Sequence, residues 1–247
     1  MISQERLAIL TVVFTLALGV SLTLSPGVAL PYGAALALLA AVSVPYLLHT
    51  HPAYKFSPLR IILPAAIALA APSIARSLAG SFTLVGVFGP PALLYACVYA
   101  EYQAVRPSAT DRARAGRLIL TLSAYVVALS FFLLIYQVKQ RSLISGTAAA
   151  AVSGGLALRL FTLDRRQDWR TNLYAFLVAV GMGEVLWPLN YWILGIAAGG
   201  VALLLAFYVF VGVMRQLLAG QLSPQVLLEY GSVALTGTLA IAIANRF

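Results

Sequence analysis

The chain has little charge, one cysteine and two histidines. Charged residues make up only 9% of its 247 residues, and seven residues are acidic; a soluble domain carries about 25% charged residues. The single cysteine, Cys97, excludes an intramolecular disulfide and a thiolate metal cluster. His49 and His51 lie together in one loop, and this spacing alone is weak evidence for a metal site. We therefore expect no metal and no cofactor.

Sequence signatures of catalysis are missing as well. The chain contains no G-x-S-x-G, H-E-x-x-H or G-x-x-x-x-G-K-[ST] pattern. It has no paired intramembrane aspartates, no carboxylate-rich motif to hold Mg²⁺ for lipid head-group transfer, and no mid-helix lysine for a retinal Schiff base. Its basic residues lie at the ends of apolar blocks rather than in one patch with interleaved aromatics, so we expect no nucleic-acid partner. These absences favour a protein that is not an enzyme.

Long apolar blocks make up the rest of the chain, which is 62% hydrophobic with a mean hydropathy of +0.94. Each block matches the roughly 20 helical residues that cross about 30 Å of hydrocarbon. We predict an all-α, polytopic transmembrane helix bundle, with one membrane domain over 1–247 and no soluble domain. The first block is expected to be retained as a helix rather than removed as a signal peptide. The predicted spanning helices are 7–25, 28–48, 59–79, 81–103, 116–137, 142–162, 171–190, 192–215 and 226–246.

The number of spans depends on the predicted helices 59–79 and 81–103, because only Ala79-Gly80 joins them and they contain four prolines. If they are re-entrant, the count falls to eight or seven. The distribution of charge favours nine spans, because twelve of the sixteen lysines and arginines then share the side of the N-terminus. The other four are Arg76, Lys139, Arg141 and Arg246.

This bias predicts a cytoplasmic N-terminus and an external C-terminus, because positive charge concentrates in cytoplasmic loops. The protein is expected in the cell membrane, as a multi-pass protein of a bacterial or archaeal plasma membrane. Its partners are then membrane lipids, with anionic head groups at the basic cytoplasmic loops, where each cation contributes about 1 kcal/mol.

Glu184 is the acidic residue with no ordinary explanation. It lies about 13 residues into the predicted helix 171–190, roughly 20 Å along its axis and inside the outer half of the membrane. A charged side chain at such a depth costs at least ~2.5–3.5 kcal/mol unless it is protonated, paired or facing water. We predict a ligand-binding site near the outer surface, formed by Glu184, Trp187, Asn190, Tyr191, Arg76, Tyr136 and Gln137. Lys139 and Arg141 are further possible partners at that level. The alternative is a Glu184–Arg76 pair, or a glutamate bonded to backbone, that only fixes helix packing.

The other acidic residues have simpler explanations. Four of them lie beside arginines in cytoplasmic segments, where solvated ion pairs are expected. Glu101 and Glu229 are expected at cytoplasmic helix ends, and the tyrosine that follows each one favours anchoring at the membrane interface.

Three functions stay open at this point. The first is non-catalytic binding or transport of a lipid-like or amphipathic ligand near Glu184. The second is an accessory subunit of a larger membrane complex, which the small residues of 142–162 and 192–215 would suit, although tight packing within the chain is the simpler interpretation of them. The third is a membrane enzyme acting on a lipid, with Glu184 as general acid or base.

Overall fold

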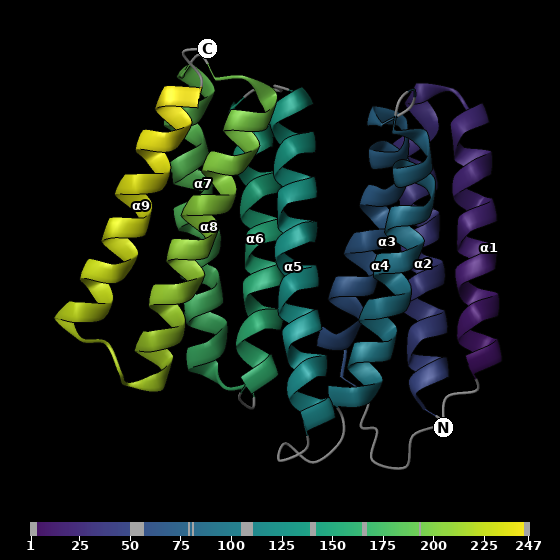
Figure 1. Ribbon diagram of the computed structural model, residues 1–247, viewed down its shortest axis with the longest axis horizontal. Coiled ribbons are helices and arrows are strands. Elements are labelled where there is room, and N and C mark those ends of the chain that lie inside the picture. The colour runs from purple at the N-terminus through teal and green to yellow at the C-terminus, as the bar shows by residue number, and fades with distance from the viewer. Residues whose placement is uncertain are drawn as a thin grey trace. The chain divides into compact units, whose positions relative to one another are not determined.

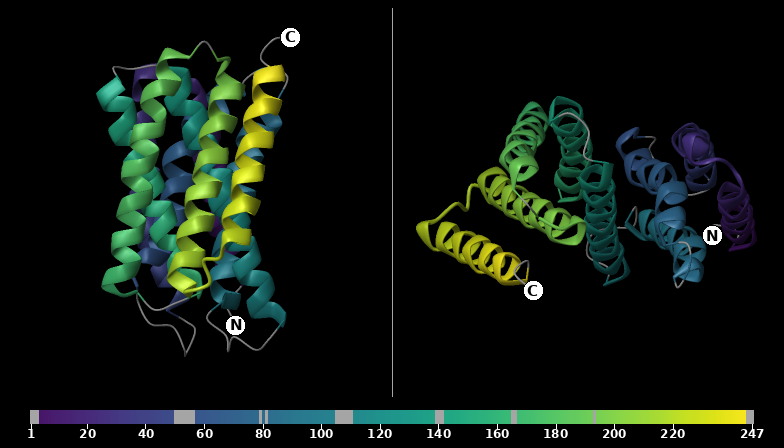
Figure 2. Two further views of the ribbon diagram at one scale, coloured as in Figure 1. Left: turned by 90° about the vertical axis from the view of Figure 1, so that its left-hand side faces the viewer. Right: turned by 90° about the horizontal axis from the view of Figure 1, so that it is seen from above.

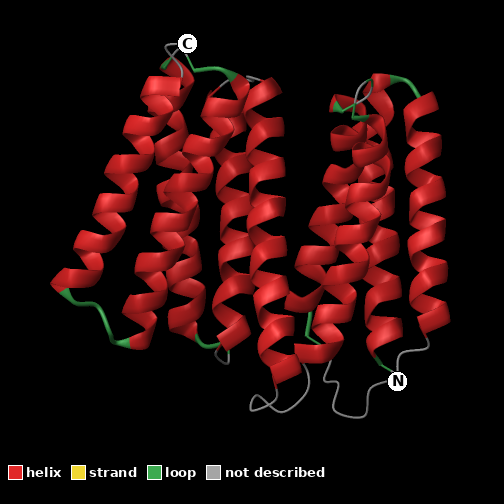
Figure 3. Cartoon of the chain, viewed as in Figure 1, coloured by secondary structure: helices red, strands yellow, loops and turns green. Residues whose placement is uncertain are grey.

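A computed structural model describes residues 4–49, 57–78, 80, 82–104, 111–138, 142–164, 167–192 and 194–244. Regular structure in these ranges is entirely helical (Figure 3). The α-helices, labelled in Figure 1, are α1 Gln4–Thr23, α2 Ala29–Leu48, α3 Leu59–Ser77, α4 Thr83–Ala104, α5 Asp111–Val138, α6 Ser142–Asp164, α7 Trp169–Tyr191, α8 Ile196–Ala219 and α9 Pro224–Ala244. A short 3-10 turn, Pro26–Val28, joins α1 to α2.

Within the described ranges, nine helices are long and apolar enough to span a membrane. The prediction of an all-helical, multi-pass membrane protein is therefore confirmed. Helices α3 and α4, which contain two prolines each, are both among the nine, so the re-entrant alternative is not needed. The prolines Pro64, Pro72, Pro90 and Pro91 lie inside these helices. In a bilayer, neighbouring helices and local adjustments can satisfy the backbone groups that a proline frees.

One predicted helix boundary is wrong. The sequence analysis began the helix after 171–190 at residue 192, but α7 continues through Pro188 and ends at Tyr191. A proline removes only its own amide donor, and here a single helical turn follows it. The chain leaves the helix at Trp192, which adopts an extended conformation (φ −81°, ψ 134°), and α8 begins four residues later than predicted, at Ile196.

The chain divides into two compact units, Met1–Val127 and Ala128–Phe247, and α5 contributes to both. In the first unit α1 to α4 pack through buried residues at helical spacing, including Phe14 and Leu18 of α1 and Leu63 and Ile67 of α3. A Cβ atom on Gly33 of α2 would lie 2.5 Å from a backbone oxygen of α3, so glycine permits this close approach. The prediction of one membrane domain without a soluble domain stays a prediction.

In the second unit, α6 and α7 pack closely along their length. A Cβ atom on Gly154 of α6 would lie 2.9 Å from the Ala179 side chain of α7. Gly199 of α8 lies against the Tyr136 ring of α5, where an added Cβ would come within 2.5 Å of the ring carbons. The small residues of α6 and α8 therefore mediate packing within the chain, as small residues commonly do between membrane helices.

The start of α7 is fixed by a capping residue. The Asp168 carboxylate accepts hydrogen bonds from the Thr171 hydroxyl and from the Thr171 amide, the latter at 2.8 Å. These two hydrogen bonds lower the pKa of Asp168 below its ordinary value. A capped N-terminus sets the helical register in which Glu184 lies.

Candidate ligand-binding groove

A groove of about 420 Å³ runs between α6 and α7 and contains Glu184. Its lining residues are Leu143, Gly146, Thr147 and Ala150 of α6 and Val180, Gly183, Glu184 and Trp187 of α7. Small residues permit the hollow, since a Cβ on Gly183 would lie 3.5 Å from the Gly146 carbonyl oxygen and 3.6 Å from the Ala150 side chain. Close helix approach and an open groove therefore occur on the same pair of helices.

Glu184 is exposed on this groove. Among the described residues, Arg114 pairs with Asp111 at 3.7 Å, and no described cation pairs with Glu184. Proline has no amide hydrogen, and Pro188 occupies the position whose amide would normally donate to the Glu184 carbonyl. Residue 184 thus presents a carboxylate and a carbonyl that lacks its usual helical donor.

The position of Glu184 along α7 places it below the interfacial aromatics. It lies seven residues before the helix end at Tyr191, or about 10 Å along the axis. Trp187 and Tyr191 follow it, with 59% and 77% of their surfaces exposed, as is common for aromatic residues at a membrane interface. The Glu184 carboxylate therefore lies about two helical turns before the end of α7.

Arg76 does not contribute to the predicted Glu184 site and instead forms hydrogen bonds at the end of α1. Its guanidinium donates to the Ser21 carbonyl at 2.6 and 3.2 Å, to Leu24 at 2.7 Å and to Ser25 at 3.0 Å. These carbonyls belong to the C-terminal end of α1 and the residues just after it, where Ser21 and Ser25 also accept from the Leu24 and Val28 amides, at 3.4 and 3.1 Å. Arg76 therefore caps α1 within the first unit, whereas Glu184 belongs to the second unit.

Tyr136, Gln137, Asn190 and Tyr191 are not among the lining residues of the Glu184 groove. The buried Tyr136 hydroxyl lies 3.2 Å from the Leu189 carbonyl and 3.3 Å from that of Trp192, so it joins α5 to the end of α7. Gln137 is exposed. The Asn190 Nδ2 atom is buried without a hydrogen-bond partner among the described residues. The structure thus brings together Glu184 and Trp187 from the predicted set.

Two further predicted partners, Lys139 and Arg141, lie outside the described residues. Within the described ranges, no group of three or more histidine, cysteine, aspartate or glutamate side chains is arranged to hold a metal ion.

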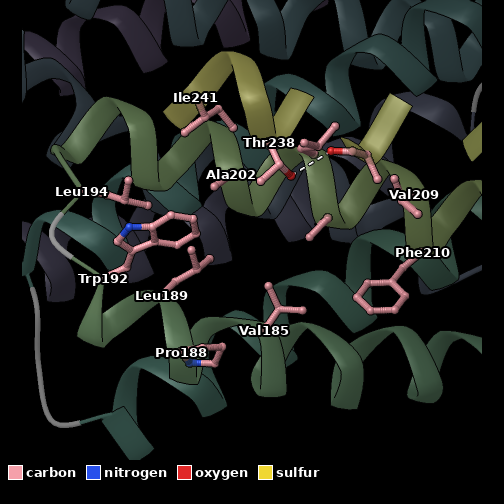
Figure 4. Close-up of a pocket in the computed structure, with 13 residues that line it drawn as sticks. Val185, Pro188, Leu189, Trp192, Leu194, Ala202, Val209, Phe210, Thr238 and Ile241 are labelled. Atoms are coloured by element: carbon pink, nitrogen blue, oxygen red, sulfur yellow. Dashed lines mark hydrogen bonds between the residues drawn. The ribbon is translucent and has the colours of Figure 1, made fainter. Parts of the chain in front are cut away.

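A second pocket, which the sequence analysis missed, lies between α7, α8 and α9 (Figure 4). It has a volume of about 380 Å³ and is lined by Val185, Pro188, Leu189, Trp192, Leu194, Ala202, Leu205, Ala206, Val209, Phe210, Ala234, Thr238 and Ile241. The Thr238 hydroxyl donates to the Ala234 carbonyl of its own helix at 2.8 Å. The pocket is therefore almost wholly apolar. In the sequence, the small side chains of Ala202, Ala206 and Ala234 on α8 and α9 were the only indication of space for this pocket.

The burial of Glu101 differs from the prediction that it lies with Tyr102 at the membrane interface. Only 1% of its surface and 8% of that of Tyr102 are exposed, so both belong to the packed interior of the first unit. Interfacial anchoring by this pair is therefore wrong. A carboxylate in the last turn of a helix is buried here because neighbouring helices cover that end of α4.

Comparison with known proteins shows which family the chain belongs to. No curated protein and no solved structure matches the chain. The model of one family covers residues 8–244, from the first spanning helix to the end of the last. Because this match takes in nearly the whole chain, the chain belongs to DUF5656, a family of proteins of unknown function.

Proposed function

We propose that this integral membrane protein binds a lipid-like, amphipathic ligand in the α6–α7 groove and does so without catalysis. The observation that carries the proposal is the exposed Glu184 carboxylate, which lies within a membrane-spanning helix and has no described cation beside it. An ionised group in that position is costly unless a partner or water satisfies it. A bound ligand with a polar end would provide such a partner.

The shape of the groove supports the same proposal. Its volume of about 420 Å³ falls in the usual range for small-molecule sites, about 300–1,000 Å³. Apart from Glu184 and Thr147, its lining is apolar, as a hydrocarbon chain requires. Binding is favoured over catalysis because Glu184 is the only described lining residue that could act as a general acid or base, and acid–base chemistry commonly uses a second positioned group.

Native mass spectrometry of the purified protein tests the proposal. We expect a co-purifying amphiphile that is lost in Glu184→Gln, a variant of nearly the same shape without the charge. Thermal stability should stay close to that of the unmodified protein. Glu229→Gln is the matched control, because Glu229 is also an exposed glutamate in a spanning helix of the second unit.

Two results would contradict the proposal. Retention of the amphiphile in Glu184→Gln would show that the carboxylate is incidental. Destabilisation by about 3–5 kcal/mol would indicate a structural ion pair, because the partner charge would be left buried and unpaired.

We keep an accessory-subunit role as a second candidate because of α9. None of its described residues is buried, and α9 packs mainly on α8, at the edge of the second unit (Figure 2). Such a helix offers a long face to another protein. Under this candidate, native mass spectra would contain a second kind of chain, and its release would not depend on Glu184.

A further inference from the structure

We propose that the polar end of the ligand in the α6–α7 groove is a primary ammonium group. This inference rests on the proposed function and names the class of its ligand. It is argued from the charge and hydrogen-bonding character of the groove, and it commits to one occupant: a hydrocarbon chain that carries –NH₃⁺.

The first argument is the acceptor that Glu184 offers to the groove. Its carboxylate accepts hydrogen bonds through two oxygens. A primary ammonium has three N–H donors and a full positive charge, so it can donate to the carboxylate and balance its charge. An anionic head group would instead be repelled by the carboxylate.

The second argument is the remaining polar character of the groove. Trp187 lines it with an exposed indole ring, and a cation over the face of a tryptophan is attracted by the ring. The Thr147 hydroxyl donates to the Ile144 carbonyl at 3.0 Å, so its hydrogen is used and its oxygen can act as an acceptor. Carboxylate, aromatic face and hydroxyl oxygen all favour a cation with N–H donors.

The apolar part of the occupant follows from the deeper lining. Ala150 and Val180, one helical turn from Gly146 and Glu184 respectively, offer no ionisable group. A chain lying over them would extend from Glu184 toward the middle of the bilayer, as an acyl or alkyl chain does.

The test uses amphiphiles that share a twelve-carbon chain and differ in the head group. The protein in dodecyl maltoside is mixed with dodecylammonium, dodecyltrimethylammonium, dodecanol or dodecyl sulfate at stepped mole fractions. Native mass spectrometry then gives the fraction of protein that carries each probe. At pH 7 dodecylammonium is positively charged, as lysine is.

We expect saturable binding of dodecylammonium that Glu184→Gln weakens tenfold or more, as expected for roughly 1.5–3 kcal/mol from a hydrogen bond to a charged group. Trp187→Leu should weaken it about two- to fivefold, through loss of a cation–π contact. Glu229→Gln should leave it unchanged. Dodecyltrimethylammonium, which lacks N–H donors, should bind at least tenfold more weakly than dodecylammonium.

The outcomes separate this inference from the proposed function. Equal binding of all four probes, removed by the groove-filling variant Thr147→Phe, would overturn the ammonium inference and leave the amphiphile-binding groove in place. Absence of saturable binding by every probe would overturn both. Tighter dodecylammonium binding after Lys139→Gln and Arg141→Gln would show that the chain's own cations occupy Glu184, and would also overturn the ammonium inference.

Discussion

Replacing Arg76 by glutamine should destabilise the first unit without affecting ligand binding at Glu184. Four contacts of 2.6–3.2 Å join its guanidinium to three carbonyls at the end of α1. Without the guanidinium, the carbonyl of the half-buried Leu24 loses its Arg76 donor, whereas the Ser21 carbonyl keeps the Leu24 amide at 3.4 Å and the Ser25 carbonyl keeps the Val28 amide at 3.1 Å. An unsatisfied buried acceptor costs about 1–3 kcal/mol. We therefore expect Arg76→Gln to cost about 1–3 kcal/mol.

Unfolding by sodium dodecyl sulfate in mixed micelles, followed by circular dichroism, measures this free energy. Arg76→Lys is the control, because it keeps the charge near the helix end but cannot reach several carbonyls at once, so it should recover part of the loss. The double variant with Glu184→Gln should show additive effects, since the two residues share no partner in the described structure. A loss below about 0.5 kcal/mol for Arg76→Gln, or strong coupling to Glu184→Gln, would refute the capping role.

Three further predictions concern topology, packing and pH. A cysteine introduced at Gln167 should be labelled only from the cytoplasm and one at Gln140 only from outside; labelling of both from one side would contradict the predicted threading. Gly199→Ala should cost about 1–3 kcal/mol in the same unfolding assay because its Cβ would meet a buried tyrosine ring, whereas Gly231→Ala, with open space around it, should be neutral or stabilising. Asp168→Ala should destabilise α7 at neutral pH and have less effect as the pH falls below about 4: the lowered pKa of Asp168 gives a stabilisation that is present above its unfolded pKa and lost as pH falls through the folded one.

The sequence alone determined how many helices cross the membrane and roughly where each one begins and ends. An apolar block must be about as long as the bilayer is thick, and its backbone must be satisfied internally, so length and composition suffice for that prediction. The same reasoning identified Glu184 and Trp187 as candidate site residues. An acidic residue in a spanning helix is conspicuous, and residues three apart share a helix face.

Only the tertiary structure decided which polar groups meet. Arg76 and Glu184 are both polar residues at membrane helices, yet the guanidinium caps α1 and the carboxylate lines the α6–α7 groove. The sequence placed Glu101 at a helix end and Glu184 inside a spanning helix, yet Glu101 is enclosed by neighbouring helices and Glu184 is exposed. These differences depend on which helices become neighbours and how closely small residues let them approach. In lipid, side-chain packing between helices determines which helices become neighbours, and the sequence of one helix alone does not show that packing.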